Sequence, residues 1–183
     1  MLVFVTGVAG SGKSTLARAL TDRGHRAVDA DEGIARHVRA EDGTPVQAPP
    51  LAGQGPAWVA AHEYRFDLAG VAALAASAGP RAPTFLLGAA YGDVEVMAAA
   101  RHSFFLDLEE TELRRRLAGR PAGSYGQAAH ELESVLAWHA QAASRYRALG
   151  ARRLDARRPP GEIADELLAA TGAGISPPRT GLE

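Results

Sequence analysis

The chain has 183 residues, and its 20 basic and 21 acidic side chains give a formal net charge of −1 at pH 7. This balance argues against a protein that coats nucleic acid, because such proteins are usually strongly basic. The absence of cysteine excludes a disulfide framework, a thiolate metal site and a thiol nucleophile, and it fits the cytoplasm, the compartment that we expect. No apolar run reaches about 18 residues, so we expect no membrane-spanning helix.

Short apolar runs alternate along the chain with segments of helical periodicity. The apolar runs predict buried strands over 2–6, 26–29, 84–87, 103–108 and 152–155. The periodic segments predict helices over 13–23, 31–40, 57–78, 94–101, 109–119, 127–149 and 162–171. This alternation predicts an α/β fold, in which helices cover both faces of a parallel sheet.

The prolines and glycines of residues 42–57 predict a long loop. We expect one domain over residues 1–171, followed by a flexible tail over 172–183.

A glycine-rich loop joins the first predicted strand to the first predicted helix. Residues 7–14 match the pattern G-x-x-x-x-G-K-S, and Lys13 is the only lysine of the chain. Glycines let backbone N–H groups turn inward around an anion, and a helix N-terminus adds partial positive charge. Lys13 would reach the β- and γ-phosphates of a nucleotide, and the Ser14 hydroxyl would bind Mg²⁺. The residues expected to bind the nucleotide here are Gly7, Ala9, Gly10, Ser11, Gly12, Lys13, Ser14 and Thr15.

Two carboxylates follow the second predicted strand. Because the carboxyl ends of parallel strands face the ligand crevice, Asp29 and Asp31 should lie near the phosphate loop. We expect Asp29 to bind Mg²⁺ together with Ser14, and Asp31 to bind the acceptor and orient or deprotonate its hydroxyl. Alternatively, Asp31 is a plain N-cap of the helix predicted after it.

The loop over 7–14, followed by Asp29-Ala30-Asp31, resembles the P-loop small-molecule and nucleotide kinases, such as shikimate kinase, gluconate kinase and the adenylate kinase group. The resemblance implies a three-layer P-loop fold whose five-stranded parallel sheet has the order 2-3-1-4-5. It implies an ATP- and Mg²⁺-dependent phosphotransferase that moves the γ-phosphate to a hydroxyl or phosphate of a small molecule or nucleotide. Substrate-side and lid insertions are then expected at about 42–66 and 113–126.

A run of arginines after the fourth predicted strand resembles the lid of these kinases. Arg114, Arg115 and Arg116 are successive on a helix and point in different directions. Arg116 and Arg120 are four residues apart and can share a face, so we expect both as catalytic contacts of the transferred phosphoryl group, with Arg116 also binding the nucleotide. Arg157 follows the fifth strand, where the resembling kinases pack a loop on adenine; it either stacks on the base or belongs to a polar surface turn.

The acceptor site is expected between residues 43 and 92. Tyr64-Arg65 resembles the Phe-Arg pair with which shikimate kinase grips its substrate carboxylate, although Leu68 replaces the glutamate that follows in that family. Aromatic and basic side chains suit a planar or an anionic acceptor. The candidate acceptor-binding residues are Asp31, Trp58, Arg65, Gly88 and Tyr91.

Two other functions stay open. Residues 104–107 resemble the apolar strand and acidic end of a Walker B motif, which suits a nucleotide-binding switch or an ATPase without a small acceptor. A nucleic-acid 5′-end kinase is a third possibility, and its binding would weaken steeply with salt. The expected partners are a nucleoside triphosphate and a small-molecule acceptor, with no membrane and no nucleic acid, in a monomer or homodimer.

Overall fold

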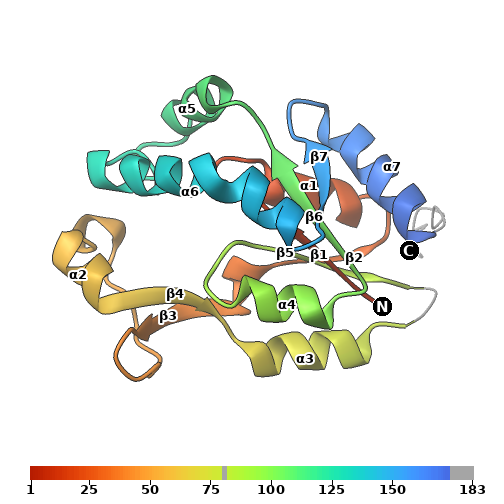
Figure 1. The fold of residues 1–183 in the computed structure, drawn as a ribbon, viewed down its shortest axis with the longest axis horizontal. Helices are drawn as coiled ribbons and strands as arrows, with labels where there is room; N and C mark the ends of the chain where they lie inside the picture. Colours follow the sequence, from red (N-terminus) through yellow and green to blue (C-terminus); the bar gives the residue numbers. More distant parts are fainter. Residues whose placement is uncertain (80–81, 174–183) are drawn as a thin grey trace, which may run out of the picture.

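The computed structural model describes residues 1–79 and 82–173 (Figure 1). A five-stranded parallel sheet has the strand order β2-β5-β1-β6-β7. Its strands are β1 (Leu2–Thr6), β2 (Arg26–Asp29), β5 (Thr84–Leu87), β6 (His102–Asp107) and β7 (Arg152–Asp155). Counted in chain order within this sheet, the order is 2-3-1-4-5, so the predicted α/β topology is confirmed.

Helices form the outer layers on the two faces of this sheet (Figure 1). They are α1 (Lys13–Thr21), α3 (Leu68–Ser77), α4 (Asp93–Ala99), α5 (Glu110–Ala118), α6 (Ala129–Ala148) and α7 (Pro160–Thr171). A further helix, α2 (Pro56–Ala61), lies away from this sheet, and short 3-10 turns occur at Ala30–Glu32 and Leu51–Gly53. Within residues 1–79 and 82–173, no helix has the length and apolarity needed to cross a membrane. Residues 174–183, most of the predicted tail, lie outside the described residues.

Alternate side chains of β1 contribute to two separate cores, because successive residues of a strand point to opposite faces. Val3 and Val5 of β1 pack in one core with α1 and α7. Leu2 and Phe4 pack in the other core with α3 and α4. All four β1 side chains are at most 2% exposed, which explains why β1 reads as an unbroken apolar run.

A second, two-stranded antiparallel sheet was not predicted. It consists of β3 (Ala35–Arg39) and β4 (His62–Phe66), and it projects with α2 from the main body of the protein (Figure 1). The predictions of a helix over 31–40 and of one continuous helix over 57–78 are therefore wrong. β4 alternates aromatic or imidazole side chains with charged ones, and this period of two suits a strand with one covered face.

The end of this small sheet also explains where α3 begins. The Asp67 carboxylate accepts a hydrogen bond from the Ala69 backbone N–H at 3.2 Å and so caps the first turn of α3. Arg36 of β3 pairs with the same carboxylate. Asp67 therefore ends β4, starts α3 and binds the neighbouring strand, which divides the stretch predicted as one helix.

Candidate active site

The phosphate loop lies between β1 and α1, as predicted. Gly10 and Gly12 have φ angles of +84° and +103°, in the left-handed region that favours glycine. Gly12 is the N-cap residue of α1, so the loop delivers its N–H groups beside a helix N-terminus. The Ser11 Oγ is buried and has no hydrogen-bond partner within the described part of the chain. These features fit a cradle for the phosphates of a nucleotide.

Lys13 extends across this loop. Its Nζ donates hydrogen bonds to the backbone oxygens of Gly7 at 2.7 Å and Val8 at 3.1 Å. Burial lowers the pKa of Lys13 to about 8, against the opposing effect of the Asp31 and Asp29 carboxylates. A partly desolvated ammonium group at this point would bind a phosphate strongly, because little water has to be removed from it.

Ser14 and Asp29, the two metal ligands that the sequence predicts, lie within hydrogen-bond distance of each other. The Ser14 hydroxyl donates to Asp29 Oδ2 at 2.7 Å, while Asp29 Oδ1 accepts from the Asp31 backbone N–H at 3.2 Å. No group of three or more metal-ligating side chains occurs in residues 1–79 and 82–173. Mg²⁺ typically takes only one or two protein ligands and completes its shell with water and substrate phosphates, so one hydroxyl and one carboxylate fit this ion.

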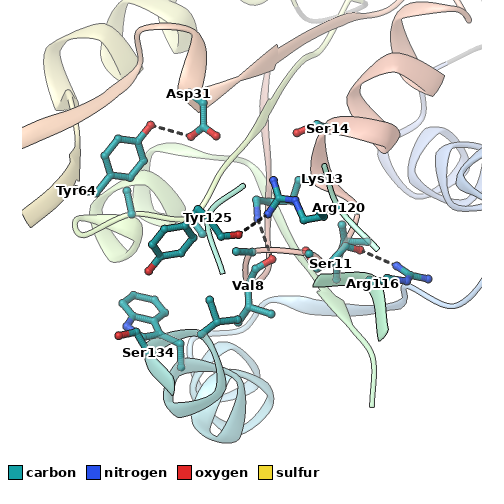
Figure 2. A pocket seen from close by; sticks show the side chains of 18 of the residues that line it. Val8, Ser11, Lys13, Ser14, Asp31, Tyr64, Arg116, Arg120, Tyr125 and Ser134 are labelled. Carbon is teal, nitrogen blue, oxygen red and sulfur yellow. Dashed lines mark hydrogen bonds between the residues drawn. The ribbon is translucent and has the colours of Figure 1, made fainter. Parts of the chain in front are cut away.

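Asp31 is held by a tyrosine of the small sheet. The Tyr64 hydroxyl donates to Asp31 Oδ1 at 2.7 Å (Figure 2). Burial and the Asp31 carboxylate raise the pKa of Tyr64, so the phenol stays protonated and remains a donor. The alternative role of Asp31 as an N-cap is not seen, because the Asp29 side chain caps the 3-10 turn at Ala30–Glu32.

Arg116 binds the phosphate loop from α5. Its guanidinium donates to the backbone oxygens of Ser11 at 3.4 Å and Ala156 at 2.8 Å, and to Glu112 at 2.7 Å. It therefore links the loop to the segment after β7. Arg114 and Arg115 pair instead with glutamates on their own helix.

Arg120 lies closer to the centre of the site. It donates to the Tyr125 backbone oxygen at 3.0 Å (Figure 2). Its charge lowers the pKa of Lys13, which places the two cations within electrostatic reach of each other. Two mutually repelling cations at one point favour binding of an anion between them.

The phosphate loop, Lys13, Ser14, Asp31, Tyr64, Arg116 and Arg120 line one cavity of about 910 Å³, whereas Asp29 is not among its lining residues. Of the residues predicted to bind the nucleotide, all except Gly7 and Arg157 line it. Arg157 does not reach the cavity because it binds Asp155 at 2.8 Å; its neighbour Arg158 lines the cavity instead.

Of the predicted acceptor-binding residues, Asp31, Trp58 and Tyr91 line the cavity. Arg65 does not, because it lies on the opposite face of β4 from Tyr64 and pairs with Glu63.

Gly88 has a packing role in this structure. A Cβ added to Gly88 would lie 2.4 Å from the Ala30 Cβ and 3.2 Å from the Phe66 ring. We expect Gly88→Ala to lower the free energy of unfolding by about 1–3 kcal/mol, the usual effect of overpacking. Chemical denaturation measures this change. Gly55→Ala is the matched control, because a Cβ there meets nothing within 4 Å; equal stability of the two variants would contradict the packing role.

The cavity residues that sequence reasoning missed include His37 of β3 and Trp138 of α6. His37 was hidden by the wrong helix prediction over 31–40. Trp138 could have been found, because it lies three and four residues after Val135 and Ser134 on one helix face, and all three line the cavity.

No protein-family model and no curated protein matches the chain. Solved structures do match it. A sugar kinase from Janibacter sp. HTCC2649 is 22% identical, with 92% of each chain covered and a TM-score of 0.52. A shikimate kinase from Acinetobacter baumannii, in complex with shikimate, is 14% identical, with 92% of this chain and 91% of that chain covered and a TM-score of 0.59.

A gluconokinase from Sinorhizobium meliloti 1021 is 23% identical, with 93% of this chain and 90% of that chain covered and a TM-score of 0.53. The protein thus has the P-loop fold that small-molecule kinases share, and the resemblance drawn from residues 7–14 and 29–31 is confirmed at the level of the fold.

Proposed function

We propose that the protein is a kinase that transfers the γ-phosphate of ATP to a hydroxyl group of a small molecule, with Mg²⁺. The observation that carries this proposal is the position of Asp31, whose carboxylate lines the same cavity as Lys13 and the phosphate loop. A fold shared with sugar, shikimate and gluconate kinases supports it.

Each part of the cavity has a task in this reaction. The loop N–H groups and Lys13 hold the phosphates and stabilise the charge that spreads over the transferred group. Ser14 and Asp29 would hold Mg²⁺, which supplies further neutralisation of phosphate charge when it is bound. Most of the catalysis then comes from positioning the donor and the acceptor in line.

Asp31 is the group that distinguishes transfer from simple binding. Its Oδ1 is engaged by Tyr64, and its Oδ2 makes no hydrogen bond to another described residue. Oδ2 can therefore accept the proton of an acceptor hydroxyl as that oxygen attacks the phosphorus. Tyr64 keeps the carboxylate oriented, so we assign it as a positioning residue.

The alternative of an ATPase without an acceptor depends on a Walker B carboxylate at the end of β6. Asp107 occupies that position, but its carboxylate is already bound by Arg153 at 2.6 Å. This arrangement does not favour the ATPase, so the kinase remains the proposal.

ADP release tests the proposal when it is measured with and without candidate acceptors, over hydroxylated metabolites, sugars and nucleosides. We expect at least one acceptor to raise ADP formation well above the slow hydrolysis background and to appear as a phosphorylated product. ADP formation that no acceptor changes, with matching release of inorganic phosphate, would favour the ATPase instead.

The lid arginine gives a more specific test. We expect Arg120→Ala to lower kcat by about 10²- to 10³-fold, the usual loss for one donor aimed at developing charge. Steady-state kinetics with the acceptor measures this effect. Arg114→Ala is the control, since Arg114 is exposed and pairs with Glu110 on its own helix. Equal rates for both variants would remove Arg120 from the reaction.

A further inference from the structure

We propose that the acceptor is an uncharged, ring-bearing alcohol rather than a carboxylate or a phosphate ester. This inference rests on the proposed function, because it names the molecule that the cavity presents to Asp31. It decides between the planar and the anionic acceptors that the sequence left open.

The part of the cavity formed by β3, β4, α2, α6 and the segment between β5 and α4 is rich in aromatic and imidazole rings. Trp58 stacks on His62 with ring centroids 3.5 Å apart and an angle of 16° between the planes. His37 lies 4.9 Å from the Tyr64 ring by centroids. Tyr91 meets Trp138 edge to face at 6.1 Å. All six side chains line the cavity, so a ligand bound in this part would contact aromatic or imidazole rings.

Part of the apolar surface in this region of the cavity is exposed to solvent. Tyr91 is 47% exposed and Val59 of α2 is 49% exposed, and both line the cavity. A ligand that covers large apolar side chains in a concave site gains binding free energy, because their surface is then removed from water. The flat or apolar face of a ring is the ligand surface that matches stacked aromatic side chains.

The charges of the cavity argue against an anionic acceptor. Among the described residues, the lysine and arginine side chains that line it are Lys13, Arg116, Arg120 and Arg158. Lys13 and Arg120 are needed for the donor phosphates. Arg116 is bound by Glu112, and Arg158 is bound by Glu162 at 3.2 Å and Glu166 at 2.5 Å.

No free lysine or arginine side chain is therefore left for the acceptor among the described lining residues. Arg65, which the sequence offered for this task, pairs with Glu63 outside the cavity. A carboxylate or phosphate on the acceptor would lose water without gaining an ionic partner, and it would lie in the same cavity as the Asp31 carboxylate.

His37 does not supply the missing charge at neutral pH. Burial and the neighbouring His62 lower the pKa of His37. The Nδ1 of His62 is engaged with the Trp58 backbone oxygen at 2.9 Å. The neutral His37 imidazole, together with Gln54 and Ser134 on the cavity wall, suits the hydroxyl, carbonyl or amide groups of an uncharged molecule.

Intrinsic fluorescence can test this inference without relying on turnover. The chain has 2 tryptophans, Trp58 and Trp138, and both line the cavity. We would titrate matched pairs against the protein with a non-hydrolysable ATP analogue and Mg²⁺ bound. The pairs are thymidine with its 5′-monophosphate, and glucose with glucuronate; shikimate and gluconate are added as further anions. Thymidine and glucose distinguish a base ring from a sugar ring.

We expect the neutral member of at least one pair to change the tryptophan emission and to bind at least about tenfold more tightly than its anionic partner. Trp58→Ala, read through Trp138, should weaken that binding by about tenfold or more, while Trp58→Phe should retain most of it. Affinity for the ATP analogue should be the same in both variants, which separates ring stacking from damage to the fold.

Two results would overturn the inference: equal or tighter binding of the anionic partners, or no change in emission with either neutral ligand. Failure of the proposed function looks different. One such result is a neutral ligand that binds through Trp58 but yields no phosphorylated product and no added ADP. That result would refute the proposed kinase activity and would still support an uncharged, ring-bearing ligand. Phosphorylation of gluconate or a nucleotide would confirm the kinase and refute the uncharged acceptor.

Discussion

Replacing Lys13 with alanine should abolish phosphoryl transfer while the fold persists. Lys13 is the only lysine of the chain, and its ammonium group bridges the loop through Gly7 and Val8. No other ammonium group can take its place against the β- and γ-phosphates. We expect kcat to fall by at least about 10³-fold, the scale of a single cation that stabilises the transition state of phosphoryl transfer. Acceptor-dependent ADP release measures the loss.

The control for this variant is stability. Because burial lowers the pKa of Lys13 to about 8, the charged form opposes folding at neutral pH. We therefore expect Lys13→Ala to lower the free energy of unfolding by no more than about 1 kcal/mol. Lys13→Arg keeps a cation but changes its shape, and it should recover only part of the rate. Wild-type turnover by a folded Lys13→Ala protein would remove the phosphate loop from the reaction.

The phosphate loop and the main sheet could be predicted because their signals are local. Residues 7–14 carry a complete pattern with fixed spacing, and the strands that are buried on both faces are unbroken apolar runs. The order of the sheet came from the resemblance, and the parallel pairing of β1 with β5 and β6 bears it out.

The acceptor side could not be predicted in the same way. Whether 62–66 is helix or strand depends on its pairing with β3, which is a contact between distant parts of the chain. That choice decides which side chain enters the cavity, since adjacent residues of a strand point in opposite directions. The sequence offered Arg65 for the acceptor, but the strand turns Tyr64 inward and Arg65 outward.

The cavity-lining arginine after β7 could not be predicted from the sequence either. Arg157 and Arg158 are adjacent, and the sequence alone gives no reason to prefer one of them for the nucleotide. The structure separates them through their carboxylate partners: Asp155 holds Arg157 outside the cavity, while Glu162 and Glu166 hold Arg158 at its wall.

Replacing Asp31 with asparagine should lower kcat by about 10²- to 10⁴-fold, the usual range for a group that accepts a proton in the transition state. The amide can still accept the hydrogen bond from Tyr64, but it cannot take the proton of the acceptor hydroxyl. Affinity for an ATP analogue should be nearly unchanged, because the loop and Lys13 are intact. Glu32→Gln removes an exposed carboxylate next to Asp31 and serves as the control.

Tyr64→Phe separates orientation from proton transfer at the same site. On its own it should lower kcat by less than Asp31→Asn does, because the carboxylate remains but is no longer held by the bond at 2.7 Å. In the Asp31→Asn protein the same change should have little further effect on kcat, since two residues that act as one unit are not additive. Independent, additive losses would mean that Tyr64 contributes by some route other than Asp31. A loss of stability from Asp31→Asn without a loss of kcat would make Asp31 a structural residue, and the proton acceptor would then lie elsewhere.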